Sequence, residues 1–213
     1  MARKVKESTE VLKIENNQGE VLAEYPPKLL DVIKNTVAKG ATDEELYMFL
    51  QVASLYDLNP FMKEIWFIKN KDGSIIITTS RDGYRKIASR DPNFKDCQAY
   101  PVHENDDFQM EMVMGEVMNI SHKFKQNERG KIVGAYGVLF THSGEKIVHY
   151  VSFDEYNQGS PVWRKYPSAM ICKVAENYLM KRFANIDGIQ TVEDAPKEVQ
   201  DASEEFIEVS VKG

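Results

Sequence analysis

The sequence predicts an α+β fold, in which an antiparallel sheet and a β-hairpin pack against helices. Three observations favour this class: helical periodicity between residues 27 and 59, strand-like apolar runs between 65 and 153, and a second helical pattern from Pro167. Of the 213 residues, 42% are hydrophobic and 28% charged, which is typical of a globular protein. We expect one core domain over residues 26–187, a flexible arm over 1–25 and an acidic flexible tail over 188–213.

The first half of the chain carries two helix signals and one hairpin signal. Apolar residues between 29 and 37 recur at helical spacing after a Pro-Pro pair. Thr42 and Glu45 have the spacing of a capping box, which predicts a second helix that ends near residues 57–60. Two apolar runs, 65–68 and 75–77, flank Lys-Asp-Gly and therefore predict a β-hairpin. Before the first of these helices, a loose arm or a marginal strand at Val21-Leu22 is expected.

The second half alternates between strand and helix signals. Ser80 is placed to cap a short helix that ends at Asp91-Pro92. Alternating residues over 108–114, followed by runs over 132–140 and 147–153, predict an antiparallel meander.

Two helices are expected at the end of this region. Ser152 and Glu155 have the spacing of a second capping box, and Pro167 opens a long helix. The apolar stripe of the long helix consists of Met170, Val174, Ala175, Tyr178 and Leu179.

The formal charge of −6 is unevenly distributed. From Asp187 onward there are eight acids and two bases, so the preceding 186 residues are neutral overall. Bases cluster with aromatic residues in two segments of this neutral body. The first cluster includes Lys69, Lys71, Arg81, Arg85 and Lys86, near Trp66 and Tyr84; the second includes Trp163, Arg164, Lys165, Tyr166, Lys173, Lys181 and Arg182. Cations neutralise phosphates and flat rings stack on bases, so this mixture suits single-stranded nucleic acid.

Motifs for other chemistry are scarce. The chain has neither GxxxxGK[ST] nor GxGxxG, and its histidines lack the HxxxH spacing of a metal site. Cys97 and Cys172 form no CxxC motif and are expected to be free thiols. No apolar run approaches the roughly 18 residues that span a bilayer, so a cytoplasmic protein is expected. A metal-dependent nuclease, using Asp106-Asp107 or Glu193-Asp194, stays open, as does an interaction protein without affinity for DNA.

Three ordered motifs resemble the RecT/Bet family of phage single-strand annealing proteins. The motifs are Leu55–Trp66 (LYDLNPFMKEIW), Asp82-Gly83-Tyr84 with Ile87, and Trp163 with Tyr166–Met170 (YPSAM) and Lys173. The resemblance covers about residues 28–190. It implies binding of single-stranded DNA and annealing of complementary strands without ATP hydrolysis.

The resemblance also implies a site, partners and a cellular setting. A DNA groove is expected beside the long C-terminal helix, where Lys173 and Lys181 match basic family positions and Arg164-Lys165 replace bases absent after Pro167. Arg81, Arg85 and Lys86 surround the second motif. No cofactor is implied, except Mg²⁺ as a counterion of DNA. The implied partners are the annealed duplex, further copies of the chain in rings or helical filaments, a phage 5′→3′ exonuclease and the host single-strand-binding protein, all in the bacterial cytoplasm.

Each candidate residue also has a purely structural interpretation. Asn59-Pro60-Phe61 are interpreted as a turn that ends a helix and starts the hairpin. Asp82-Gly83 would shape a strand-to-helix turn. Trp66, Trp163 and Tyr166 are either packing residues or platforms for bases.

Overall fold

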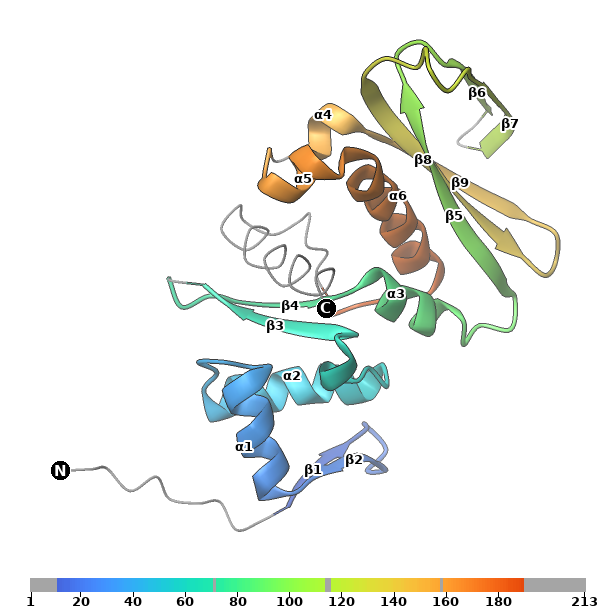
Figure 1. Ribbon diagram of the computed structural model, residues 1–213. Helices are drawn as coiled ribbons and strands as arrows, with labels where there is room; N and C mark the ends of the chain where they lie inside the picture. The colour runs from blue at the N-terminus through green and yellow to red at the C-terminus, as the bar shows by residue number, and fades with distance from the viewer. Residues whose placement is uncertain (1–10, 71, 114–115, 158, 190–213) are drawn as a thin grey trace. The chain divides into compact units, whose positions relative to one another are not determined.

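The computed structural model describes residues 11–70, 72–113, 116–157 and 159–189, which divide into two compact units. Among these residues, the first unit holds 11–83 and 188–189, and the second holds 84–187. Both combine helices with antiparallel strand pairs, so the predicted α+β class is confirmed (Figure 1). Except for residues 188 and 189, the predicted acidic tail lies outside the described residues. Within the described ranges, no helix is long and apolar enough to cross a membrane.

The first unit begins with a hairpin where the sequence predicted a loose arm or a marginal strand at Val21-Leu22, and that strand is present as part of β2 (Val21–Tyr25). Strand β1 (Leu12–Glu15) pairs antiparallel with β2. The Asn16 side chain accepts hydrogen bonds from two backbone N–H groups of the turn, and Ile14 is fully buried. The hydroxyl groups of Tyr25 and Ser54 lie 3.2 Å apart. The contact between Tyr25 and Ser54 of the following helix stabilises a segment whose own strand pattern is weak. Residues 1–10 of the predicted arm lie outside the described residues.

Two helices follow, α1 (Pro27–Thr36) and α2 (Asp43–Leu55), as the sequence predicted. The capping box of α2 is confirmed: the Glu45 N–H donates to Thr42 Oγ1 at 3.2 Å, and the Thr42 N–H donates to Glu45 Oε2 at 2.8 Å. The apolar face of α2 is buried. It consists of Leu46, Phe49, Leu50 and Ala53.

The Leu55–Trp66 motif ends α2 and starts the next hairpin. Asp57 adopts a left-handed backbone conformation with a φ of 45°, and the Leu58 N–H donates to the Ala53 carbonyl at 2.8 Å. Asn59 Oδ1 then accepts from the Phe61 N–H at 2.9 Å and caps the 3₁₀ helix η1 (Pro60–Met62). The turn interpretation of Asn59-Pro60-Phe61 therefore describes the observed structure.

Strands β3 (Ile65–Lys69) and β4 (Ile75–Thr79) form the predicted hairpin, followed by α3 (Arg81–Ala88). Ser80 Oγ accepts from the Gly83 N–H at 3.1 Å, as expected for a cap. A Cβ atom at Gly83 would overlap Thr79 Oγ1 and the Glu64 carbonyl oxygen. Glycine is therefore required there because the backbone passes too close to β3 and β4 for any side chain.

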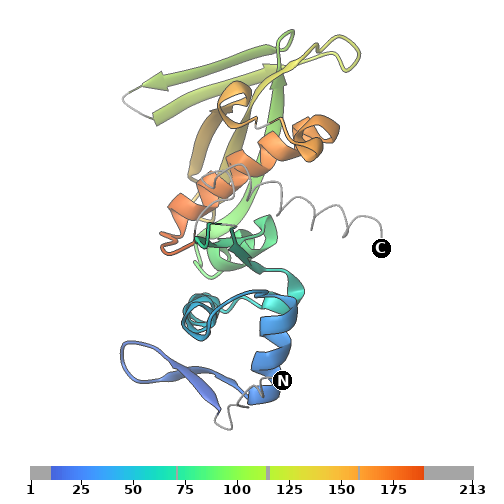
Figure 2. The same cartoon turned by 90° about the vertical axis from the view of Figure 1, so that its left-hand side faces the viewer.

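The second unit contains a three-stranded antiparallel sheet in the order β5-β8-β9 (Figure 2). Its strands are β5 (Phe94–His103), β8 (Ile132–Thr141) and β9 (Lys146–Ser152). The predicted pairing of runs 132–140 and 147–153 is confirmed, whereas the predicted strand over 108–114 belongs to a different sheet. A two-stranded ribbon, β6 (Asp107–Val113) with β7 (Glu116–Lys123), is inserted between β5 and β8. Ribbon residues Phe108 and Ile120 pack against Tyr136 on one face of the sheet.

The other face of the sheet is covered by α6 (Pro167–Phe183), the predicted long helix (Figures 1 and 2). A Cβ atom at Gly137 would lie 2.7 Å from Leu179 Cδ1 and 3.1 Å from the Ala175 carbonyl oxygen. The helix therefore contacts β8 more closely than a side chain at that position would allow. Cys97 of β5 is buried in this layer, where burial raises the pKa of its thiol to about 12.

Two short helices, α4 (Phe153–Tyr156) and α5 (Pro161–Lys165), connect β9 to α6. The predicted capping box at Ser152 and Glu155 is wrong, because the Ser152 side chain makes no capping hydrogen bond. Ser152 still belongs to β9, where it pairs with Gly134, and α4 is only four residues long.

Candidate nucleic-acid interface

Lys69 on β3 is bound to a carboxylate of its own unit. Its Nζ lies 2.7 Å and 3.0 Å from the two carboxylate oxygens of Glu45, and both side chains are largely buried. The Lys69 hydrogen bond and the Thr42 backbone N–H hold the pKa of Glu45 below its usual value. Lys69 therefore links β3 to the cap of α2 in this structure. Lys71, its predicted neighbour in the site, lies outside the described residues.

Arg85 on α3 is also engaged within the protein. Its guanidinium donates to Asp96 Oδ1 at 2.7 Å and to the Cys97 carbonyl at 2.5 Å. The hydrogen bond between the two side chains lowers the pKa of Asp96 and raises the pKa of Arg85, so both groups are charged. Two of its donors therefore tie α3 to β5 in this structure, and the phosphate contact of Arg85 stays a prediction. Arg81 is exposed at the start of α3, and Lys86 is half-buried.

Trp163 is a core residue. It is 2% exposed and packs edge-on against Phe153, with ring centroids 5.7 Å apart. It belongs to the same core cluster as Ala135 and Ala175. This burial favours the packing interpretation of Trp163 over the interpretation as a platform for bases.

The three residues after Trp163 form an exposed cationic and aromatic segment. Arg164 and Lys165 are exposed at the end of α5, and Tyr166 is 42% exposed. Lys165 Nζ lies 5.1 Å from the centroid of the Tyr166 ring, and Arg164 donates to the Gly159 carbonyl. The segment thus places one guanidinium group, one ammonium group and one aromatic ring at the start of α6.

The predicted cations of α6 have different environments. Arg182 is exposed, whereas Lys173 and Lys181 are half-buried. Lys181 and Arg182 occupy the last turn of the helix. The predicted apolar stripe is confirmed at four of its positions, but Tyr178 is 39% exposed and stacks on His149. Helical spacing missed this pair because His149 belongs to β9, and no local pattern joins it to Tyr178.

Asp106 is occupied by internal partners, which weakens the nuclease alternative. Arg129 donates to both of its carboxylate oxygens, at 3.0 Å and 2.7 Å, and His122 Nε2 lies 2.9 Å from Oδ2. The Asp106 side chain is fully buried. Arg129 also donates to the Pro101 carbonyl at 2.7 Å, so the cluster closes the base of the β6–β7 ribbon.

No metal-binding cluster supports a nuclease in the described parts of the chain. They contain no group of three or more His, Cys, Asp or Glu residues that could hold a metal ion. Glu193 and Asp194, the second acidic pair considered, lie outside the described residues.

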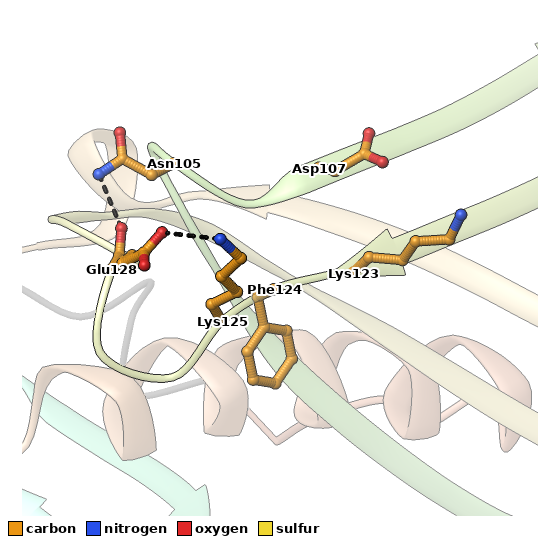
Figure 3. A pocket seen from close by; sticks show the side chains of 6 residues that line it. All are labelled: Asn105, Asp107, Lys123, Phe124, Lys125 and Glu128. Atoms are coloured by element: carbon orange, nitrogen blue, oxygen red, sulfur yellow. Dashed lines mark hydrogen bonds and ion pairs between the residues drawn. The ribbon is translucent and has the colours of Figure 1, made fainter.

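An open pocket of about 540 Å³ lies beside the ribbon (Figure 3). Its lining contains an exposed Lys123-Phe124-Lys125 triplet that the sequence analysis did not single out. Arg129 covers the Phe124 ring at 3.8 Å, and Lys125 pairs with Glu128 at 3.4 Å. Asp107 and Glu128 balance the two lysines, so this pocket has no cationic character of its own.

The Asp106 cluster predicts a specific dependence of stability on pH. The Arg129 hydrogen bonds, followed by those from His122 and the His103 N–H, hold the pKa of Asp106 well below its usual value. A carboxyl group whose pKa is lower in the folded than in the unfolded state stabilises the folded protein above the pKa of the unfolded state, about 3.9. This stabilisation is lost progressively as the pH falls below that value. We expect Asp106→Asn to lower the free energy of unfolding at pH 7 by about 3 kcal/mol, a difference that narrows below pH ~4.

Urea unfolding of both proteins at a series of pH values measures this difference. Asp107→Asn is the matched control, because Asp107 is adjacent and exposed. Equal stability of Asp106→Asn and the unchanged protein at pH 7 would contradict the role assigned to the cluster.

Comparison with known proteins identifies the family. The chain matches the RecT family over residues 23–207, a range that includes every predicted site residue. Over 70 residues it is 33% identical to a protein of Escherichia phage lambda named recombination protein bet. That alignment covers 32% of this chain and 27% of the lambda protein. Because the family match extends over most of the 213 residues, the chain belongs to the RecT family.

Proposed function

We propose that the protein binds single-stranded DNA without sequence preference and anneals complementary strands without ATP. The observation that carries the proposal is the RecT family match over residues 23–207. The exposed segment from Arg164 to Tyr166 supports it, because it combines cations with a ring at the start of α6. Cations would neutralise the phosphates while the ring contacts bases, and neither interaction reads sequence.

The proposed setting is phage-type recombination in the cytoplasm of a bacterial host. A 5′→3′ exonuclease would supply the single strands, and the host single-strand-binding protein would be displaced or engaged. Mg²⁺ would act only as a counterion of the DNA. Co-purification of tagged protein with these two partners from phage-infected cells, against an untagged control, tests this part of the proposal.

Annealing is tested with two complementary labelled oligonucleotides. We expect the protein to accelerate duplex formation in the absence of any nucleotide, because it would bring neutralised strands together. Shortened strands in the presence of Mg²⁺ would support the nuclease alternative instead. A flat binding curve at low salt would favour an interaction protein without affinity for DNA.

Phosphate contacts are tested by the salt dependence of binding. Each of Lys173, Lys181 and Arg182, when replaced by Ala, is expected to weaken binding to every sequence and to reduce the slope of log affinity against log salt by roughly 0.7. Fluorescence anisotropy over a salt series measures both effects. Lys39→Ala is the control, because Lys39 is exposed on the loop between α1 and α2. Unchanged slopes for the three α6 variants would assign these residues to a solvated helix surface.

We also propose that copies of the chain assemble into rings or filaments on DNA. The motif after α2 exposes large apolar side chains, with Met62 70% exposed and Leu55 and Phe61 also exposed. Exposed apolar groups of this size are typical of contact surfaces between proteins. The occupant proposed for this surface is a second copy of the chain.

Sedimentation velocity tests the assembly. We expect large species that grow when single-stranded DNA is added, and smaller species for the double variant Phe61→Ser, Met62→Ser. Val32→Ser on α1 is the matched control, since Val32 is likewise an exposed apolar residue of the first unit. A protein that anneals strands as a strict monomer would refute the assembly proposal.

A further inference from the structure

An exposed tyrosine of α6 is stacked on a histidine of the underlying sheet. The rings of Tyr178 and His149 lie 3.7 Å apart between centroids, with only 10° between their planes. Tyr178 is 39% exposed, while His149 is half-buried. Because the imidazole covers one face of the Tyr178 ring, a further flat ring could stack only on the opposite face.

The sheet holds the histidine in place. His149 lies on β9 directly opposite Gly137 of β8, so no side chain from the neighbouring strand competes for the space. Val151, two residues further along β9, is buried in the core cluster on the α6 side of the sheet. The imidazole therefore projects from β9 toward α6 and packs against the sheet-facing side of the Tyr178 ring.

A cation lies one helical turn from the tyrosine. Arg182 follows Tyr178 by four residues on α6 and is exposed. Burial, followed by the positive charge of Arg182, lowers the pKa of His149, which places the guanidinium within electrostatic range of the ring pair. Because a lowered histidine pKa leaves the ring neutral at pH 7, the stack adds no charge of its own there.

We propose that His149 and Tyr178 form a stacking platform for one nucleobase of a single strand, and that Arg182 contacts a phosphate of the same or the adjacent nucleotide. A planar base would stack on the face of the Tyr178 ring that is opposite His149. One helical turn is about 5.4 Å long, so a single nucleotide can reach both groups. This inference rests on the proposed function and adds a site that the family match does not assign.

Base stacking and phosphate contact are separated by comparing a normal oligonucleotide with an abasic strand of equal length. We expect Tyr178→Leu to weaken binding of the normal strand about 5- to 100-fold and to leave binding of the abasic strand unchanged. Tyr178→Phe keeps the ring and should bind both strands within about twofold of the unchanged protein. Arg182→Ala should weaken binding of both strands and lower the salt slope, because every strand has phosphates.

Tyr100→Leu is the matched control. Tyr100 is a tyrosine of similar exposure, 42%, and it packs on Tyr136 at the opposite face of the sheet. This variant should bind both strands normally. Circular dichroism melting of all variants excludes loss of fold as the cause of weaker binding.

A second measurement needs no destabilising substitution. In the unchanged protein and in Tyr178→Phe, a 2-aminopurine base placed along the strand should show quenched fluorescence where it stacks on the ring. Absence of quenching at every position, or an equal loss by Tyr178→Leu on normal and abasic strands, would overturn the platform. A wild-type protein that binds neither strand would instead refute the proposed function itself, and the platform with it.

Discussion

The close contact between α6 and β8 determines the arrangement of the second unit. At Gly137 the helix approaches the strand so closely that a Cβ atom would lie 2.7 Å from Leu179 Cδ1. This contact brings Ala175 and Val174 into one buried cluster with Trp163 and Ala135. With one side of α6 packed on the sheet, Tyr178 and Arg182 are left exposed, while Lys173 and Lys181 are half-buried. Which residues of α6 are available to contact DNA therefore depends on how the helix packs on the sheet.

Residues that carry the family resemblance serve mainly the scaffold. Asp57 reverses the chain after α2, Asn59 caps η1, and Gly83 allows α3 to start beside β3 and β4. Trp163 fills the core beneath α5. Tyr166 differs from these, because much of its ring is exposed beside Lys165. The motifs thus identify the fold, and of their residues Tyr166 and Lys173 also belong to the surface proposed to bind DNA.

Local patterns predicted the elements better than they predicted the site. The Thr42 capping box, the β3–β4 hairpin and the α6 helix depend on neighbouring residues, and all three are present. The role of Arg85 depends on Asp96 of β5, and that of Lys69 depends on Glu45 of α2. A count of nearby bases cannot show whether a carboxylate from another element already binds them. The Tyr178 stack was missed for the same reason, since its partner comes from a different strand.

The Cys97 thiol lies in the layer between α6 and β5, where burial lowers its reactivity. Burial holds its pKa near 12, so the sulfur stays protonated at physiological pH. Oxidants and alkylating reagents react with the thiolate, and they also need access to the sulfur. The Cys97 thiol is consequently a poor target for oxidants. Cys97 contributes there as a small apolar side chain, packed as an alanine or a valine would be.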